Sequence, residues 1–217
     1  MNICFVGFGN IAQAIIGGLL KSGMSTENIA CIERNQQKIA LLKEKNLRMI
    51  QLENLASENF DLILLAVKPK DALKTEKDIF NNAPESILIT VVAGIALNKY
   101  SKPGSIIRSM PNTACAFGKG ITALYADDQK SNGFKNANKL FSRTGHVLAL
   151  ENEEEMHRFT SIIGSGQAFL FQVLKVYLLE LEKIAFNDGS NLNDVFNHFV
   201  SSLGDSFAEE PDFENLI

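Results

Sequence analysis

The chain opens with the stretch Ile3-Cys4-Phe5-Val6-Gly7-Phe8-Gly9-Asn10-Ile11-Ala12, in which an apolar run meets a glycine turn. Residues 3–6 are typical of a buried strand, and an apolar-faced helix is expected to begin at Asn10. Gly7 allows a tight turn, Gly9 lets the backbone approach a diphosphate, and Ala12 permits close packing of helix and strand. This is the G-x-G-x-x-A variant of the dinucleotide-binding motif. Its place between a strand and a helix favours that function over a purely structural glycine turn.

The composition leaves room for one full domain and a smaller second one, since the chain has 217 residues and 46% of them are hydrophobic. The net charge is −4 and no block of basic residues occurs, so we expect no nucleic-acid partner. The three cysteines, Cys4, Cys31 and Cys115, lie far apart, two of them in predicted strands. This spacing predicts buried thiols in a reducing compartment and no metal site.

Targeting and metal-binding signals are absent from the sequence. Residues 1–20 lack the basic start of a secretory signal, and no apolar run reaches the length that spans a membrane. The histidines His146, His157 and His198 are scattered without the spacing of zinc ligands. We therefore expect a soluble cytoplasmic protein with neither a membrane partner nor a bound metal.

Strand and helix patterns alternate over residues 1–150, which predicts an α/β domain with a Rossmann-type, doubly wound parallel sheet. The expected strands are Ile3–Val6, Asn28–Glu33, Asp61–Val67, Ser86–Ala93, Ser105–Ser109, Ile121–Tyr125 and His146–Leu150. The expected helices are Asn10–Ser22, Gln36–Lys45 and one near Phe134–Arg143, with a short helical turn at Leu97–Tyr100 and a loop at Met110–Gly120.

The pattern changes after Leu150, where acidic residues suit the first turn of a helix. Helical periodicity continues to about Asn187 across a small-residue patch, Gly164-Ser165-Gly166, and returns over Asn191–Ala208. No strand signal occurs there, so residues 151–217 are predicted to form an all-helical domain. Glycines inside a helix cost about 1 kcal/mol each relative to alanine, so the patch serves either close helix packing or contact of a ligand or partner helix with the backbone.

Residues Glu33-Arg34-Asn35 end the second expected strand, where a dinucleotide fold meets the adenosine ribose. An acidic side chain there favours the free 2′-hydroxyl of NADH, whereas arginine and small polar groups favour the 2′-phosphate of NADPH. Both kinds are present. We favour NADPH, held by Arg34 and Asn35 with Glu33 turned aside, because the arginine supplies the charge that a phosphate needs. NADH remains possible, and Glu33 and Arg34 paired on the surface are the structural alternative.

Three further segments follow strands at the edge of the sheet where ligands bind. In Ala66-Val67-Lys68-Pro69, the alanine is too small to obstruct a cofactor, and Lys68 either reaches a ribose or phosphate or is an ordinary surface lysine. The small residues of Val92-Ala93-Gly94 let the backbone pass close to the nicotinamide ribose. Asn112 carries both a donor and an acceptor that suit a carboxamide or a substrate, and Arg108 is either a carboxylate clamp or part of a salt bridge.

Together these motifs resemble those of the pyrroline-5-carboxylate reductase family, along the whole of the sequence. The segments that carry the resemblance are Val6-Gly7-Phe8-Gly9-Asn10-Ile11-Ala12, Leu65-Ala66-Val67-Lys68-Pro69, Val92-Ala93-Gly94-Ile95, Arg108-Ser109-Met110-Pro111-Asn112-Thr113, Gly118-Lys119-Gly120 and Gly164-Ser165-Gly166. Ordered motifs at the family's spacing are far more specific than the first motif alone.

The resemblance implies hydride transfer from NADPH or NADH to carbon 5 of a cyclic imine, which gives L-proline. It implies no particular catalytic side chain here, because a protonated imine is already electrophilic and positioning supplies much of the rate. It also implies a helical domain that forms a homodimer, or a larger homo-oligomer, by interleaving helices. The implied cofactor contacts are Val6, Gly7, Phe8, Gly9, Asn10 and Ile11 at the diphosphate, Glu33 and Asn35 beside the adenosine ribose, and Ala66, Val67, Lys68, Pro69, Val92, Ala93 and Gly94 along the rest.

The sequence departs from the family pattern in two motifs and at its end. Gln167-Ala168-Phe169 stands where the family usually has Pro-Ala-Tyr, and Ala114 stands where it has a proline. Family members continue past the position of Leu216 into a Ser-Pro-Gly-Gly-Thr-Thr loop, and this loop, supplied by the partner subunit, binds the substrate carboxylate. The 151–217 domain is therefore expected either to lack a tail that belongs to it or to be that of a shortened relative with an incomplete substrate site.

Two other functions remain as alternatives. A β-hydroxyacid dehydrogenase would place a catalytic lysine four residues beyond the last glycine of the helical patch, but Leu170 occupies that position and disfavours this reading. A non-catalytic nucleotide-binding or assembly homologue, without the carboxylate-binding loop, would bind the cofactor without turnover.

Overall fold

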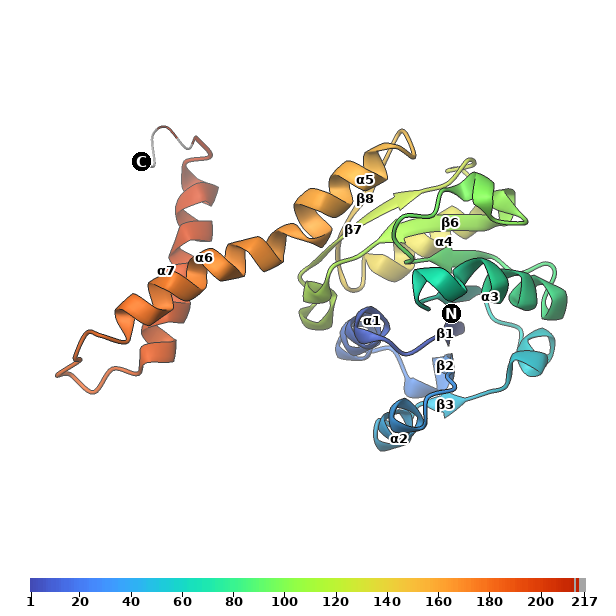
Figure 1. Ribbon diagram of the computed structural model, residues 1–217, viewed down its shortest axis with the longest axis horizontal. Helices are drawn as coiled ribbons and strands as arrows, with labels where there is room; N and C mark the ends of the chain where they lie inside the picture. Colours follow the sequence, from blue (N-terminus) through green and yellow to red (C-terminus); the bar gives the residue numbers. More distant parts are fainter. Residues whose placement is uncertain (213, 215–217) are drawn as a thin grey trace. The chain divides into compact units, whose positions relative to one another are not determined.

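Residues 1–212 and 214 are described by the computed structural model and fall into two units, each described here by itself (Figure 1). The first unit comprises residues 1–165, and the second begins at Gly166. The sequence pattern changes at residue 150, but α5 (Glu155–Phe159) belongs with the first unit because Met156 and Phe159 are buried with Met110 and Ala123. The expected end of the helical domain, Ile217, lies outside the described residues.

The first unit contains one sheet, in the strand order β3-β2-β1-β4-β5-β6-β7-β8. Its strands are β1 Ile3–Val6, β2 Ile29–Ile32, β3 Arg48–Met49, β4 Leu62–Leu65, β5 Leu88–Thr90, β6 Ile106–Met110, β7 Gly120–Tyr125 and β8 Gly145–Ala149. The chain order reverses between β1 and β4, whose last residues, Val6 and Leu65, are paired. This strand order confirms the predicted Rossmann-type fold. Open α/β sheets bind ligands at the carboxyl ends of the strands at such a switch point.

One strand pair differs from the prediction of a parallel sheet. Strands β6 and β7 are antiparallel, with Arg108 opposite Tyr125 and Met110 opposite Ala123, whereas the other pairs are parallel. A parallel neighbour needs a long crossover, but the connection between β6 and β7 holds only the short 3-10 helix η5 (Thr113–Phe117). The chain therefore turns back on itself at this point.

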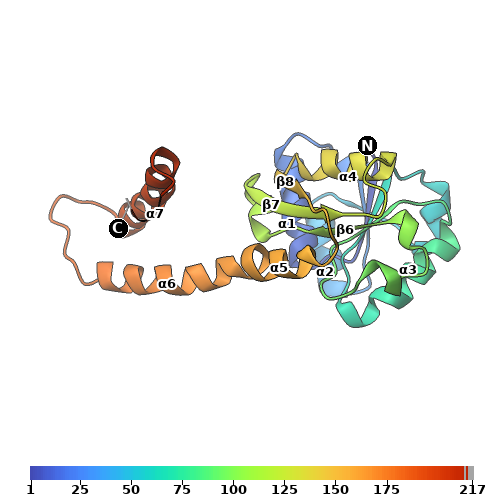
Figure 2. The same ribbon diagram turned by 90° about the horizontal axis from the view of Figure 1, so that it is seen from above.

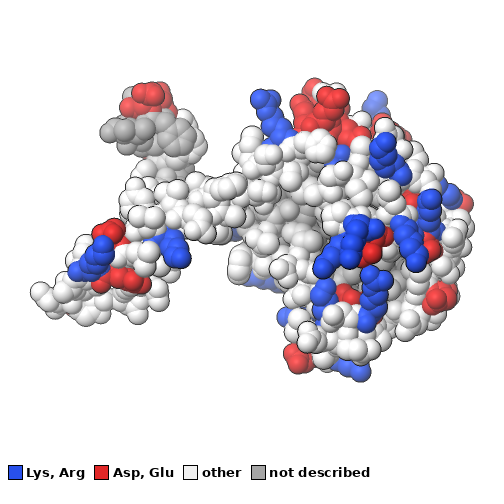
Figure 3. Space-filling model, viewed as in Figure 1, with Lys and Arg blue, Asp and Glu red and all other residues white. Residues whose placement is uncertain are grey.

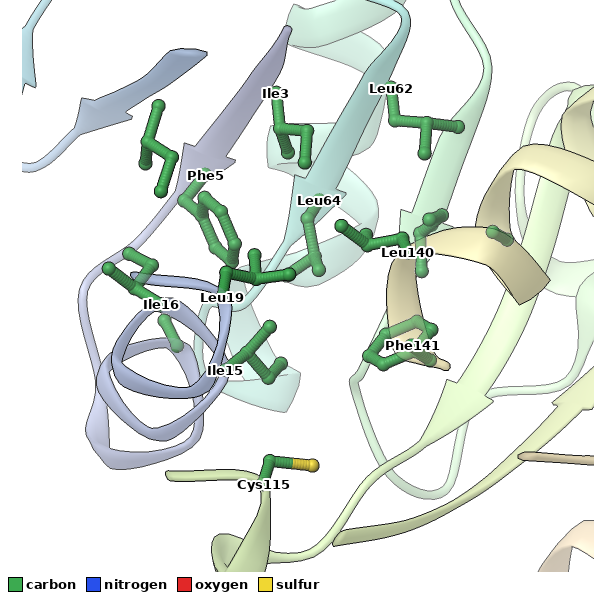
Figure 4. Packing of buried hydrophobic residues seen from close by; sticks show 14 of the residues in the cluster. Ile3, Phe5, Ile15, Ile16, Leu19, Leu62, Leu64, Cys115, Leu140 and Phe141 are labelled. Atoms are coloured by element: carbon green, nitrogen blue, oxygen red, sulfur yellow. The ribbon is translucent and has the colours of Figure 1, made fainter. Parts of the chain in front are cut away.

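Helices cover both faces of the sheet (Figure 2). The helices are α1 Asn10–Lys21, α2 Gln36–Glu44, α3 Pro69–Asn82 and α4 Asn132–Phe141, with 3-10 turns at η1 Thr26–Asn28, η2 Leu52–Ser57, η3 Leu97–Lys99 and η4 Pro103–Ser105. Helices α1, α2 and α4 share a buried cluster on one face, and α3 packs in a second cluster on the other. In Figure 4, Phe5 and Leu64 of the sheet face Ile15 and Leu19 of α1 and Leu140 of α4.

Helix α3 is an element that the sequence pattern does not predict. Pro69, interpreted only as the end of a strand, is the first residue of this helix, a position that suits proline because its missing N–H has no acceptor there. The buried side of α3 includes the polar Glu76 between Ala72 and Ile79, which breaks the apolar periodicity. The consequence for the site is that Lys68 becomes the N-cap residue of a helix.

The second unit consists of α6 (Gly166–Leu181) and α7 (Leu192–Glu209) within its described residues. The rings of Tyr177 and Phe199 lie 5.6 Å apart and join the two helices. Seven apolar side chains of α6 remain between 46% and 71% exposed: Phe169, Leu170, Phe171, Val173, Val176, Tyr177 and Leu179. So much exposed apolar surface on one helix marks an interaction site.

By length and composition, one helical stretch passes the test for a membrane span, against the expectation from the sequence. Among the described residues this stretch is Glu155–Leu181, which is 27 residues long, and an 18-residue window within it has a mean hydropathy of 1.5 with none of it buried. Thr160, Ser161 and Ser165 interrupt the apolar run but hardly lower its mean. A helix whose apolar side packs against another protein chain passes the same test, so this finding is weak evidence for a membrane.

Candidate dinucleotide-binding site

The glycine-rich turn joins β1 to α1 as the sequence predicts. Gly7 has a φ of +97°, and a Cβ at this residue would lie 2.6 Å from the carbonyl oxygen of Ala66, just after β4. Helix α1 begins at Asn10 with Gly9 as its N-cap, and no side chain caps it. The N–H groups of its first turn therefore lack an intrahelical acceptor and lie at the positive end of the helix dipole. This geometry fits an anionic diphosphate.

The carboxylate of Glu33, which follows β2, turns toward the backbone and is 8% exposed. Its Oε2 accepts the N–H of Phe8 at 2.9 Å, and its Oε1 accepts the N–H groups of Arg34 at 2.8 Å and Asn35 at 2.9 Å. Burial raises the pKa of Glu33, but these three donors and the nearby Lys38 outweigh it and hold the pKa below its ordinary value. Glu33 is thus an ionised group whose oxygens are occupied by backbone donors.

Cationic side chains surround this corner of the site. Lys38 Nζ lies 3.6 Å from Glu33, and Arg34 Nη2 lies 3.2 Å from Asp71 on the first turn of α3. The Arg34 side chain is 87% exposed and is held by this contact with Asp71. Asn35 caps α2 by accepting the N–H of Lys38. Figure 3 shows Lys and Arg side chains gathered on the face of the first unit that it presents.

A cleft brings most of the predicted residues together along the ends of β1, β2 and β4. It is lined by Gly7, Gly9, Asn10, Glu33, Arg34, Asn35, Lys38, Ala66, Val67, Lys68 and Asp71. An adjoining hollow shares Gly7, Glu33, Arg34 and Val67 with the cleft and adds Val6. Lys38 and Asp71 are residues that sequence reasoning missed. Lys38 lies three residues after the N-cap Asn35, a recognisable signal, whereas Asp71 belongs to the unpredicted α3.

The turn after β5 is held by buried polar contacts. Thr90 Oγ1 lies 3.0 Å from the hydroxyl of Tyr100 and accepts the N–H of Val92 at 3.2 Å. Burial raises the pKa of the Tyr100 phenol, while Thr90 and Arg108 act to lower it. Val92 packs into the core, whereas Ala93 and Gly94 are exposed beyond it. This segment therefore offers no more than the backbone and the methyl group of Ala93.

A second pocket lies where the first turn of α1 meets the segment after β6. Asn112 and Ile11 line it together with Val91, Met110, Pro111, Thr113, Thr160, Gly164 and Ser165. The π-helical turn η6 (Thr160–Gly164) forms one side, and Ser165 donates its N–H to Thr160. The amide oxygen of Asn112 accepts the N–H of Ile121 at 3.1 Å, which leaves its amide nitrogen to donate. The small-residue patch thus contributes Gly164 and Ser165 to a pocket, a role the sequence left open.

Five predicted residues line neither pocket nor the adjoining hollow: Phe8, Pro69, Val92, Ala93 and Gly94. The Phe8 ring is buried in the core, so only its backbone belongs to the glycine turn. Pro69 is exposed at the start of α3 and lines neither pocket. These assignments of cofactor contacts stay predictions.

Comparison with known proteins identifies the family. A family model described as NADP oxidoreductase coenzyme F420-dependent matches residues 2–94. The pyrroline-5-carboxylate reductase of Haemophilus influenzae is 31% identical over 194 residues, which cover 86% of this chain and 71% of that protein. The chain belongs to the pyrroline-5-carboxylate reductase family.

Solved structures of pyrroline-5-carboxylate reductases agree with this assignment. The protein from Coxiella burnetii has a TM-score of 0.77 at 25% identity, with 97% of this chain and 81% of that one covered. The Plasmodium falciparum protein, solved with NADP bound, has a TM-score of 0.80 at 21% identity. The match covers 97% of this chain and 79% of that one. At that identity the second match supports the Rossmann fold of the family.

The site holds groups that bind and orient, rather than a nucleophile or a metal centre. No cluster of three or more His, Cys, Asp or Glu side chains suited to a metal occurs within residues 1–212 and 214. Burial raises the pKa of the Cys31 thiol to about 12 and also raises the pKa of Cys4, so neither is a thiolate near neutral pH.

Proposed function

We propose that this chain reduces pyrroline-5-carboxylate to L-proline with NADPH as the preferred hydride donor. The observation that carries the proposal is the glycine-rich turn at the β1–β4 switch point, in a chain of the pyrroline-5-carboxylate reductase family. A bound nicotinamide nucleotide supplies the hydride, which is delivered to carbon 5 of the cyclic imine.

The residues of the chain bind and orient the two reactants. The N–H groups at the start of α1 hold the diphosphate. Gly7 permits this turn because a side chain there would meet the carbonyl oxygen of Ala66. The pocket beside η6 receives the nicotinamide end and the imine, where the free amide nitrogen of Asn112 donates to a carboxamide or carboxylate oxygen. A protonated imine is already electrophilic, so holding it against the hydride donor supplies much of the rate.

The preference for NADPH rests on the corner of the cleft around Arg34. Arg34, Asn35 and Lys38 are polar or cationic and line the cleft together, which suits a 2′-phosphate. The negative charge of Glu33 is partly offset, because its oxygens accept three backbone N–H groups and lie near Lys38. Lys68, exposed at the N-cap of α3, adds a further positive charge at the edge of the cleft.

The proposal includes a homodimer, or a larger homo-oligomer, formed through α6 and α7. The exposed apolar side chains of α6 and the exposed Leu203 of α7 form an apolar surface that the described residues do not cover. Buried free cysteines accord with the cytoplasm as its location. Sedimentation equilibrium of the full-length protein tests assembly, and Val173→Glu is expected to shift it toward the monomer.

An activity assay of the full-length protein decides between reductase and non-catalytic homologue. When the protein is mixed with NADPH and pyrroline-5-carboxylate, the absorbance of NADPH is expected to fall as L-proline forms. Arg34→Ala is expected to weaken NADPH binding by about tenfold, the loss of one charge-assisted hydrogen bond, with NADH unchanged. Tight NADPH binding without L-proline would instead favour the non-catalytic homologue.

A further inference from the structure

Glu33 connects two loops that would hold adjacent parts of an adenine dinucleotide, its diphosphate and its adenosine ribose. One of its oxygens accepts the N–H of Phe8, between the two glycines of the first turn. The other accepts the N–H groups of Arg34 and Asn35, the segment beside the adenosine ribose. Lys38 of α2 adds an ion pair at 3.6 Å. Both oxygens of the carboxylate are therefore occupied by the protein.

This arrangement differs from the usual role of an acidic residue at the end of the second strand. In dinucleotide-binding folds that residue accepts a hydrogen bond from the ribose 2′-hydroxyl and selects NADH. Here each oxygen already accepts backbone donors, and the pKa of the carboxyl lies below its ordinary value, in keeping with an anion that these donors stabilise. Of the roughly four acceptor positions of a carboxylate, three are taken by backbone N–H groups, and the side chain is 8% exposed. Rotating Glu33 toward a ribose would leave these N–H groups without their acceptor, at a cost of about 1–3 kcal/mol for each one that stays buried.

The buried Phe8 ring, together with the Glu33 contact, fixes the position of the glycine turn. Phe8 is fully buried, so its side chain cannot shift along the core. Its N–H is fixed by Glu33, and the neighbouring Gly7 is fixed by its N–H bond to the carbonyl of Ile32 at 2.9 Å. The turn is thus tied at two successive residues to the end of β2.

We propose that Glu33 is a positioning residue that sets the separation between the diphosphate-binding turn and the Arg34–Asn35 segment, and that it does not select between NADPH and NADH. The inference rests on the proposed function only in taking a nicotinamide dinucleotide as the ligand. Because Glu33 acts through the turn that both nucleotides share, its loss weakens both to the same extent.

The test compares Glu33→Gln with the wild-type protein by calorimetric titration of NADPH and of NADH. The amide of glutamine places an NH2 donor against a backbone N–H donor, so one side of the connection is lost while shape is kept. Glu33→Gln is expected to raise the dissociation constants of both nucleotides about tenfold, which is what losing one charge-assisted bond amounts to, and to leave their ratio unchanged within about twofold. Glu44→Gln, which changes an exposed carboxylate at the end of the following helix α2, is the matched control.

Each other result overturns the inference. Loss of NADH affinity alone would mean that Glu33 contacts the ribose, and unchanged affinity for both nucleotides would mean that the connection has no effect on binding. If Glu33→Gln does not fold, amide exchange of the wild-type protein decides: the Phe8 N–H is expected to be protected at neutral pH and to lose protection when Glu33 is protonated. A fast-exchanging Phe8 N–H at neutral pH also overturns the inference. Failure of the wild-type protein to bind either nucleotide would refute the proposed function, but the exchange measurement would still test Glu33.

Discussion

The guanidinium Nη1 of Arg108 lies 2.7 Å from Oε1 of Glu153, and the same oxygen accepts the N–H of Leu97 at 2.7 Å. Arg108 on β6 is 2% exposed, whereas Glu153, just before α5, is 25% exposed. The pair ties β6 to the turn at η3 and to the start of α5. Arg108 is therefore part of a salt bridge and is not available as a carboxylate clamp, the alternative that the sequence left open.

Removal of the carboxylate is expected to destabilise the first unit. Glu153→Ala leaves the buried guanidinium of Arg108 without its partner, and we expect the free energy of unfolding to fall by about 3 kcal/mol. Urea unfolding measures this loss. Glu151→Ala, an exposed carboxylate two residues earlier, is expected to change the stability by less than about 0.5 kcal/mol. Equal losses in the two variants would show that the ion pair contributes nothing specific.

Alanine substitutions at the two glycines of the first turn are expected to change different properties, stability at Gly7 and NADPH affinity at Gly9. Gly7→Ala puts a Cβ 2.6 Å from the Ala66 carbonyl oxygen at a φ of +97°, so it is expected to destabilise the fold by about 1–3 kcal/mol. Gly9→Ala meets nothing closer than 3.9 Å and has a φ of −78°, so the fold is expected to be kept. Gly9→Ala is instead expected to lower NADPH affinity at least about tenfold, because the added methyl group occupies the path of the diphosphate.

Thermal unfolding and calorimetric titration separate these effects. Gly17→Ala is the matched control on α1, since nothing lies within 4 Å of its added Cβ. It is expected to leave NADPH affinity unchanged and to stabilise the helix by up to about 1 kcal/mol. Wild-type NADPH affinity in Gly9→Ala would contradict a diphosphate at this turn.

Low pH is expected to lower the folding stability of the wild-type protein because Glu33 becomes protonated. Its pKa in the folded protein lies below the ordinary value of 4.5, so its ionised form contributes stability at pH values above 4.5, and that contribution is lost as the pH falls through the folded pKa. The difference in melting temperature between the wild type and Glu33→Gln should therefore be largest near neutral pH and shrink as the pH is lowered toward 3. A constant difference across this range would show that ionisation of Glu33 does not stabilise the fold.

The glycine turn was predictable because it depends on local sequence. Gly7, Gly9 and Ala12 have one shared structural reason, close approach of backbone, and the strand before them is uniformly apolar. The orientation of Glu33 was anticipated as turned aside, but its partners were not, because the Phe8 N–H lies 25 residues away in the chain. Only the folded chain brings them together.

Other features depended on packing that the sequence does not display. Helix α3 was missed because the buried Glu76 interrupts its apolar side, and with it the contact of Asp71 with Arg34 was missed. The antiparallel β6–β7 pair was missed because parallel and antiparallel strands share a period of two. The pocket at η6 needs a π-helical turn, which helical periodicity cannot distinguish from an α-helix.

Asp71 is expected to lower the affinity of the site for NADPH. It lies 3.2 Å from Arg34 and lines the same cleft, so its negative charge both opposes a 2′-phosphate and holds the arginine that would bind it. Asp71→Asn removes both effects, and we expect NADPH to bind roughly threefold to tenfold more tightly while NADH is unchanged, because a partly exposed charge pair contributes about 1 kcal/mol. Asp127→Asn, exposed and outside the cleft, is the control for net charge. Equal gains in the two variants would assign the effect to the overall charge, and equal gains for the two nucleotides would place the 2′-phosphate away from Arg34.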